Sequence, residues 1–231
     1  MTLVVLDAAL RLPPALRDLS IKISADLASR MVSAGSRSHF TLGDRVPGTA
    51  NECYEPHLSL FMLAVTESEV EGVVQAVKLV AAQNPAVAVV GQEYRHNPVG
   101  APELHLVPSL AWSALQAKVV DAVEPLRRGR LRDRDPSGTV LQELVDDLRR
   151  TGEDPQRLAQ LLRYGYDEIT DHSAQRFSPH ITFAWPVDGH RVGLDGLPPA
   201  SDVVGELTDL AVYQMREHGT CTQLHGVFPL G

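Results

Sequence analysis

The sequence predicts a fold that combines helices and strands in two related halves. Two apolar segments repeat the pattern Pro-His-apolar-hydroxyl-apolar: EPHLSLFMLAV at 55–65 and SPHITFAWPV at 178–187. Amphipathic helical patterns alternate with strand-like segments along the rest of the chain. With 231 residues, of which 44% are hydrophobic, the chain is long enough for one compact domain or two tightly joined lobes.

The first half is expected to hold helices and strands in alternation. Apolar residues at three- and four-residue spacing predict a helix from 14 to about 32, and Thr66 with Glu69 forms a capping box that opens a second helix. Between these helices we expect a short strand at 38–43 and a strand at 57–65. After the second helix we expect a pair of strands at 85–94 and 103–109, and then a helix at 111–123 that ends before Pro125.

The second half begins with a change of composition. From about 127 to 171 the chain is charged and contains two helical patterns, at 139–150 and 154–166, the first with a capping box from Thr139 and Gln142. Strand signals return at 180–187, and 203–215 is expected to form a hairpin with 221–228. We therefore expect one domain over 1–231, with a charged helical insertion at about 127–171.

The two repeated segments place polar side chains on one face of each strand. Successive residues of a strand point to opposite faces, so His57 shares a face with Ser59, and His180 with Thr182. Burying these groups without partners would be costly, which favours a wet cleft between two sheets. Two imidazoles across such a cleft suit acid–base chemistry, and hydroxyl donors beside them suit phosphate oxygens. This arrangement requires neither a metal nor a cofactor.

The segments PHLSLF and PHITFA resemble the paired motifs of the two-histidine (2H) phosphoesterase superfamily, which includes 2′-5′ RNA ligase-like proteins and RNA cyclic phosphodiesterases. The resemblance implies a bilobal α+β fold, with two antiparallel sheets related by a pseudo-twofold axis, helices outside and a central cleft. It also implies that His57 and His180 are the catalytic pair and that Ser59 and Thr182 bind phosphate. The implied enzyme is a metal-independent hydrolase of a 2′,3′-cyclic phosphate or a 2′-5′ phosphodiester.

Other residues are candidates for the same site. His39 begins His-Phe-Thr-Leu, which fits the motif except for the missing proline, and could replace His57 or lie beside it. The repeated Pro-His pair and the longer apolar strand favour His57 over His39 as the histidine of the first motif. Further candidate substrate contacts are Tyr94, by stacking on a base, His105, by alternation with apolar neighbours, and Arg176, by its place before the second motif.

The charge balance limits the partners. The net charge of −8 disfavours a protein that tracks a long nucleic-acid duplex, so a small nucleotide or a short RNA end is the expected partner. Two cysteines imply no disulfide framework, and no segment is apolar over eighteen residues, which favours a cytoplasmic protein without a membrane partner. A non-enzymatic nucleotide or phosphate binder of the same fold is the alternative. The substrate, the direction of the reaction, the acid and base roles and the oligomeric state stay open.

Overall fold

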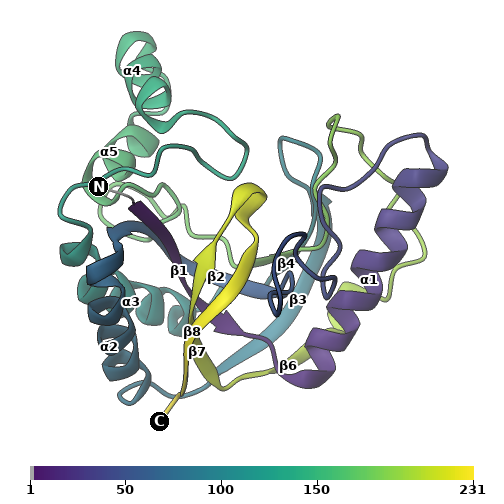
Figure 1. Cartoon of the computed structure of the whole chain (residues 1–231), viewed down its shortest axis with the longest axis horizontal. Helices are drawn as coiled ribbons and strands as arrows, with labels where there is room; N and C mark the ends of the chain where they lie inside the picture. The colour runs from purple at the N-terminus through teal and green to yellow at the C-terminus, as the bar shows by residue number, and fades with distance from the viewer. Residues whose placement is uncertain (1–2) are drawn as a thin grey trace.

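The computed structural model describes residues 3–231, and these form two four-stranded sheets and five α-helices (Figure 1). The strands are β1 Leu3–Arg11, β2 His57–Thr66, β3 Val87–His96, β4 Pro102–Leu106, β5 His180–Thr182, β6 Val204–Leu207, β7 Asp209–Met215 and β8 Cys221–Pro229. The helices are α1 Pro14–Ser33, α2 Val70–Ala81, α3 Leu110–Arg127, α4 Leu141–Thr151 and α5 Pro155–Tyr164. Short 3₁₀ turns are η1 Glu67–Glu69, η2 Ala200–Asp202 and η3 Glu217–Gly219.

The two sheets meet along their motif-bearing strands. One sheet has the strand order β2-β1-β7-β8 and the other β5-β4-β3-β6, and every pairing is antiparallel. Strands β2 and β5 are therefore both edge strands, and they lie side by side, with Cα atoms within 8 Å. The expected α+β fold with two antiparallel sheets is confirmed.

Helices cover the outer face of each sheet. Helices α2 and α3 pack together and against β2, β7 and β8. Helix α1 lies on the other side of the molecule, where the Ser24 hydroxyl donates to the Phe183 carbonyl just after β5 (Figure 1). Successive residues of each motif strand point to opposite faces, so one face is buried under the helices. Leu58 and Ile181 are fully buried, whereas the motif residues on either side of them are half-buried. One continuous apolar core extends through both halves.

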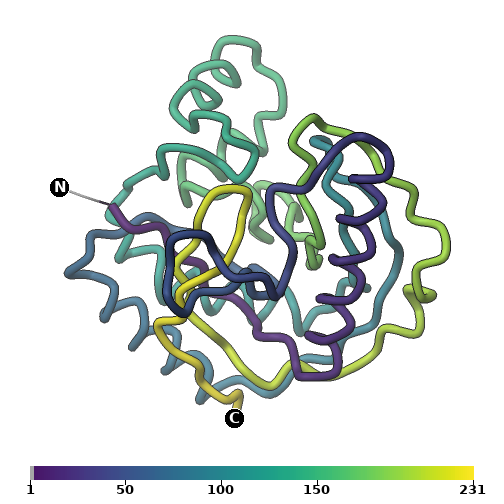
Figure 2. The backbone as a smooth tube through the Cα atoms, turned by 45° about the vertical axis from the view of Figure 1, so that its right-hand side comes forward, coloured from purple at the N-terminus to yellow at the C-terminus, as the bar shows by residue number. Residues whose placement is uncertain are grey.

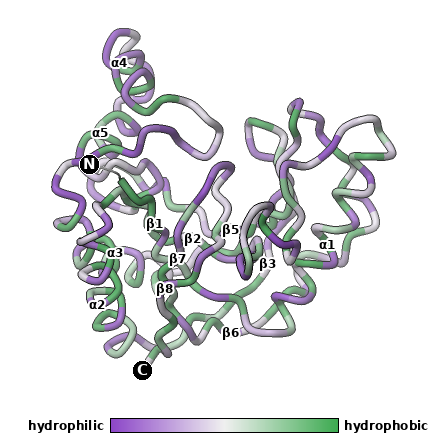
Figure 3. Tube along the Cα trace, viewed as in Figure 1, coloured by the Kyte–Doolittle hydropathy of each residue, from purple (hydrophilic) through white to green (hydrophobic). Residues whose placement is uncertain are grey.

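The charged segment 127–171 carries α4 and α5. Both helices have the predicted amphipathic pattern, and four buried residues make a small separate core between them: Leu141, Val145, Leu148 and Leu161. Hydrophobic residues follow β1 and the α2–α3 side, whereas α4 alternates between hydrophilic and hydrophobic (Figure 3). In Figure 2 the loop before α4 approaches the tip of the β7–β8 hairpin, and Pro136 lies against Gly219 there.

Several predicted elements agree with the structure. The helix at 14–32, the strand pair at 85–109 and the β7–β8 hairpin are confirmed. The first capping box is also present, because Glu69 accepts both the Thr66 amide and the Thr66 hydroxyl at 2.8 Å. It opens η1, which continues directly into α2.

Two predicted strands are corrected. Residues 38–43 are not a strand, since their amides bond to a side chain and to loops: His39 to the Trp185 carbonyl and Leu42 to the Ser24 hydroxyl. The strand expected at 180–187 ends at Thr182, because its partner β4 begins at Pro102, which accepts the Phe183 amide, and the backbone of Trp185 then bonds to Ser38 and His39.

Three other details differ. The segment 203–215 serves both sheets: β6 pairs with β3, and β7 pairs with β8, with a change of direction between them. Helix α3 continues past Pro125, because Arg127 is buried and bonded to Glu124 in the last turn. The capping box expected at Thr139 is absent, since the Asp135 carboxylate accepts the Thr139 amide and α4 begins after Val140.

Within residues 3–231, no helix combines the length and apolar character needed to cross a bilayer.

Candidate active site

A cleft of about 700 Å³ lies where the two sheets meet. Both motifs line it, since its walls include His57, Ser59, His180 and Thr182. The structure thus brings together two histidines and two hydroxyls that are far apart in the sequence. Because β2 and β5 are neighbouring edge strands, each sheet supplies one histidine and one hydroxyl to the same space.

The first motif is oriented by backbone and by a buried carboxylate. His57 Nδ1 lies 2.8 Å from the Glu55 carbonyl oxygen, an acceptor, so Nδ1 carries the proton and Nε2 is turned into the cleft. The Ser59 hydroxyl donates to Asp7 Oδ2 at 2.6 Å, and the same oxygen lies 3.7 Å from His57 Nε2. Asp7, fully buried on β1, therefore touches both polar side chains of the motif.

The second motif repeats this geometry on the other sheet. His180 Nδ1 lies 2.7 Å from the Ser178 carbonyl oxygen, so its Nε2 also remains for the cleft. Glu103 Oε1 lies 3.9 Å from that Nε2 and accepts the Thr182 hydroxyl at 3.5 Å. Each histidine thus has a carbonyl behind it, a hydroxyl two residues on, and a buried carboxylate from the neighbouring strand.

Sequence reasoning missed both carboxylates. Asp7 interrupts an otherwise apolar strand, VVLDAAL, and Glu103 opens the apolar strand ELHL. A lone carboxyl group in a buried strand needs a partner, and that was the available signal. The pairing itself depends on register, because a β-bulge between Ala8 and Ala9 sets which β1 residues face Ser59.

The charges around the two histidines differ. Burial lowers the pKa of His180, but the carboxylates of Glu103 and Glu168 and the Ser178 carbonyl raise it more, so its pKa is above the ordinary value. Burial raises the pKa of Asp7, and this effect exceeds the opposing effects of His57 and Ser59. For Glu103, burial acts to raise the pKa, but His105, His180 and Asn97 together hold it below its usual value.

His105 supports the second carboxylate from β4. Its Nε2 lies 2.9 Å from Glu103 Oε2, and its ring stacks on that of His180 with 5.3 Å between centroids. Its Nδ1 lies 2.9 Å from an Arg95 nitrogen and 3.1 Å from the Ser178 hydroxyl. His105 lines the cleft, as predicted, but its contacts are those of a group that positions Glu103.

The other candidate residues lie in different places. Arg176 lines the cleft, where it is paired with Asp154 at 2.9 Å. Tyr94 packs on Phe183, with ring centroids 6.1 Å apart, and does not line the cleft. His39 is exposed and does not line the cleft, although its ring stacks at 3.8 Å on the cleft-lining ring of His218.

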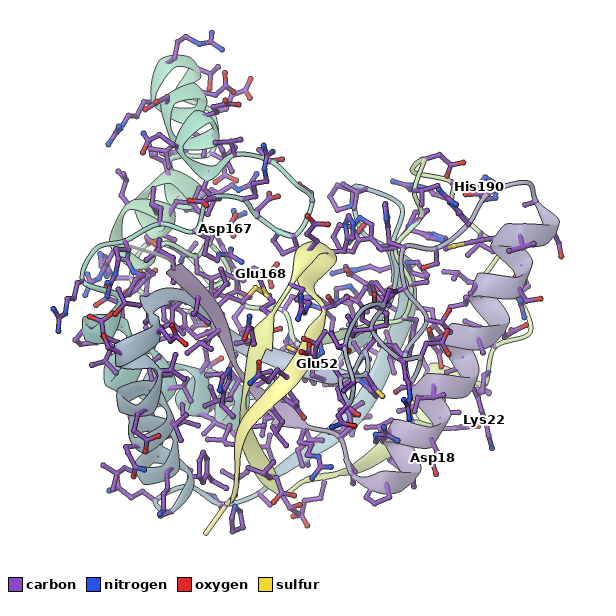
Figure 4. All side chains as sticks on the ribbon, in the orientation of Figure 1. Asp18, Lys22, Glu52, Asp167, Glu168 and His190 are labelled. Carbon is purple, nitrogen blue, oxygen red and sulfur yellow. The ribbon has the colours of Figure 1, made fainter. Side chains whose placement is uncertain are left out.

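The charged segment 127–171 supplies one wall of the cleft. Its contributions include Arg132, Tyr166, Asp167 and Glu168, none of which the motifs indicate. Asp167 and Glu168, labelled in Figure 4, lie toward the middle of the molecule, whereas His190 lies at its rim. The β7–β8 hairpin adds His218 and Gly219, although the sequence indicates only a turn there.

Among residues 3–231, two groups of side chains come close enough to share a metal ion, with ligand atoms within 4.8 Å of one another. One group is Asp7, His57 and Cys221, and the other is Glu103, His105 and His180. In each group the carboxylate is already hydrogen-bonded within the protein. Burial raises the pKa of the Cys221 thiol well above its ordinary value, which keeps it in the protonated form that binds metals poorly. The donor sets therefore suit hydrogen bonding better than metal binding.

Comparison with known proteins adds the fold relationship. No family model matches the sequence, and no curated protein sequence matches it at a significant level. Solved structures, however, match along the whole chain. Escherichia coli LigT in its apo form aligns over 100% of this chain and 99% of its own, with a TM-score of 0.52 and 13% identity.

The chain has the LigT fold. The protein TT0787 of Thermus thermophilus shares it, with a TM-score of 0.53, 15% identity, and coverage of 98% of this chain and 97% of its own. So does a protein described as a phosphoesterase, with a TM-score of 0.53, 12% identity and 99% coverage of both chains. The fold that the resemblance of the two motifs implies is confirmed. At these identities the LigT fold is what the comparison establishes.

Proposed function

We propose that this chain is a phosphoesterase that hydrolyses a 2′,3′-cyclic phosphate or a 2′-5′ phosphodiester at a short RNA end or in a small nucleotide. The duplicated geometry of the two motifs carries the proposal: two imidazole Nε2 atoms and two hydroxyls, from different sheets, line one cleft. The LigT fold supports it, and LigT itself has been crystallised with ATP and with 3′-AMP, at TM-scores of 0.51 and 0.50 to this chain. We expect the enzyme to act in the cytoplasm.

The proposed reaction uses the two histidines as acid and base. One Nε2 takes a proton from water as the water oxygen bonds to phosphorus, and the other Nε2 protonates the departing ribose oxygen, which leaves a phosphomonoester. We expect Ser59 and Thr182, which line the cleft, to turn their hydroxyl protons from Asp7 and Glu103 to the non-bridging oxygens, on which negative charge accumulates in the transition state. Asp7 and Glu103 orient these groups from behind.

We assign the acid to His180 and the base to His57. His180 faces Glu103, whose hydrogen-bond partners and neighbouring histidines hold its pKa below the usual value, and Glu168, whose pKa is raised by burial. Glu103 is therefore the charge that chiefly favours the protonated form of His180. His57 faces the carboxyl group of Asp7, whose pKa is raised by burial, so the charge that could stabilise an imidazolium is weaker there. On this assignment His57 takes the proton from water and His180 gives its proton to the departing ribose oxygen.

Hydrolysis of a nucleoside 2′,3′-cyclic phosphate in EDTA tests the proposed function directly. We expect turnover with the same rate, within about twofold, in EDTA and in added Mg²⁺, because protein side chains supply every proton transfer. Rates are measured by separation of the nucleotide products. Tight binding of the cyclic nucleotide with no turnover would contradict the proposal and favour a nucleotide-binding protein. Activity that disappears in EDTA and returns with a metal would contradict metal independence.

The pH profile tests the assignment of the acid. If His180 must be protonated, activity falls as the pH rises through its raised pKa, which gives the alkaline limb of the kcat/KM profile. The Glu168→Gln substitution removes a negative charge that raises this pKa, so the alkaline limb should move to lower pH by about half to one unit. Glu143→Gln, an exposed change on α4, is the control and should leave the limb in place. An acidic limb that moves instead would assign the base to His180.

A further inference from the structure

Arg132 is a buried arginine that faces the cleft without an ion-pair partner. It lies in the insertion, between α3 and α4, it is 3% exposed, and it lines the cleft. Among residues 3–231, no carboxylate oxygen comes within 4.0 Å of its guanidinium. Arginine stays protonated in proteins, so a full positive charge is held in a largely dry place.

The contacts of Arg132 do not satisfy this charge. Its Nη1 donates to the Met62 sulfur at 3.2 Å, a weak acceptor, and the guanidinium lies 5.8 Å from the centroid of the Tyr166 ring. Its Nε is buried and has no hydrogen-bond partner within the described part of the chain. A guanidinium has five N–H donors in a planar fork, and the Met62 sulfur is the acceptor that the described residues offer it.

Neighbouring arginines show that this is unusual for the cleft. Arg157 pairs with Asp167 at 2.5 Å, and Arg176 pairs with Asp154 at 2.9 Å, so both side chains are neutralised within the protein. Breaking a buried pair is expensive, and a buried arginine with no pair at all is costlier still unless a ligand completes it. Arg132 therefore fits a ligand-binding role, whereas Arg157 and Arg176 fit structural ones.

The position of Arg132 separates it from the reacting phosphate. On β2 the bulge that skips Leu60 puts Ser59 and Met62 on the same, cleft-facing side, and Arg132 lies at Met62. Because of the bulge, Ser59 and Met62 pair with Ala9 and Asp7, two positions apart on β1, so Met62 lies roughly 7 Å along the strand from Ser59 and farther from His57. The arginine therefore lies along the same wall of the cleft, beyond the motif hydroxyls.

We propose that Arg132 binds a second phosphate of the substrate, the one on the 5′ side of the reacting nucleotide. This proposal rests on the proposed function for the identity of the substrate, but the anion site itself does not depend on turnover. A terminal 2′,3′-cyclic phosphate has its next phosphate on the 5′ side, which makes that group the available anion. The enzyme would then prefer 5′-phosphorylated or oligonucleotide ends to simple nucleosides.

Binding of unreactive nucleotides tests the second site. The dissociation constants of adenosine 3′,5′-bisphosphate and adenosine 3′-monophosphate are measured by calorimetry for the wild type and for Arg132→Met. We expect the wild type to bind the bisphosphate about 10- to 100-fold more tightly, and Arg132→Met to bind both about equally. Arg134→Met, an exposed change in the same loop with the same loss of charge, should keep the wild-type preference.

Equal binding of the two nucleotides by the wild type, or a preference that survives in Arg132→Met, would overturn the proposal. Thermal melting separates a ligand-binding from a structural arginine. Without ligand, Arg132→Met should melt no lower than the wild type, since the substitution removes an unpaired buried charge. A variant that melts well below the wild type and keeps the preference assigns Arg132 a structural role. If the wild type hydrolyses no cyclic phosphate but binds the bisphosphate more tightly than the monophosphate through Arg132, the proposed function is contradicted and the second anion site is still supported.

Discussion

Replacing His57 or His180 with alanine should lower kcat/KM for a nucleoside 2′,3′-cyclic phosphate by about 10²- to 10⁴-fold, the usual contribution of a positioned acid or base. Each imidazole presents Nε2 to the cleft because its Nδ1 is held by a backbone carbonyl. Alanine removes the proton-transfer atom and leaves that carbonyl at the edge of a solvated cleft. Steady-state hydrolysis in EDTA measures the loss.

The controls for this result come from the same chain. His172→Ala changes an exposed histidine and should leave kcat/KM within about twofold of the wild type. The double variant His57→Ala with His180→Ala should lose little more than the worse single variant, because residues that act as one unit are strongly non-additive. Wild-type rates in both single variants would refute the assignment of the pair.

The Glu103→Leu substitution should reduce the free energy of unfolding by about 3–5 kcal/mol. Glu103 is 5% exposed and its carboxylate is bonded to His105, Asn97 and Thr182. Leucine fills similar space but leaves three polar groups without an acceptor, and an unsatisfied buried group costs about 1–3 kcal/mol. The loss includes the turn after β3, since Asn97 also accepts the amides of Val99 and Ala101.

Urea unfolding as a function of pH measures this effect and its sign. Since the folded state holds the pKa of Glu103 below its usual value, its stabilising contribution is present above the unfolded pKa and is lost as the pH falls through the folded pKa. The wild type and Glu103→Leu should therefore differ most near neutral pH and converge in acid. Glu206→Leu, an exposed change on β6 of the same sheet, is the control and should cost less than about 0.5 kcal/mol. A difference that grows in acid would contradict this account.

Local patterns in the sequence predicted the elements whose causes are local. The alternation in PHLSLF and PHITFA predicted which side chains share a face, and the structure places His57, Ser59, His180 and Thr182 around one cleft. Helix α1 follows from its three- and four-residue spacing, and the capping box at Thr66 follows from two side chains three residues apart. The roles of the motif residues, and one domain with an insertion at about 127–171, stay predictions.

Features that depend on long-range contacts escaped sequence reasoning. Residues 38–43 have strand-like composition, but the Ser24 hydroxyl and the Trp185 carbonyl take their amides in the folded chain. Segment 203–215 has one continuous strand-like pattern, yet the pairing partners of its two parts belong to different sheets. The role of Asp7 follows from its contact with Ser59, which the fold creates, since Asp7 belongs to no recognisable motif. Arg132 belongs to an arginine-rich stretch of the sequence, but only the fold distinguishes it from the other arginines there.

The abutting edge strands β2 and β5 have a mechanical consequence. Neither sheet alone contains both imidazoles, so the distance between the Nε2 atoms of His57 and His180 depends on how the two halves pack against each other. A tilt of a few degrees at this junction would alter the reach between proton acceptor and proton donor while each half kept its own internal bonds. We therefore expect that substitutions along this junction, away from the nucleotide, change the rate of the reaction although the reacting side chains stay the same.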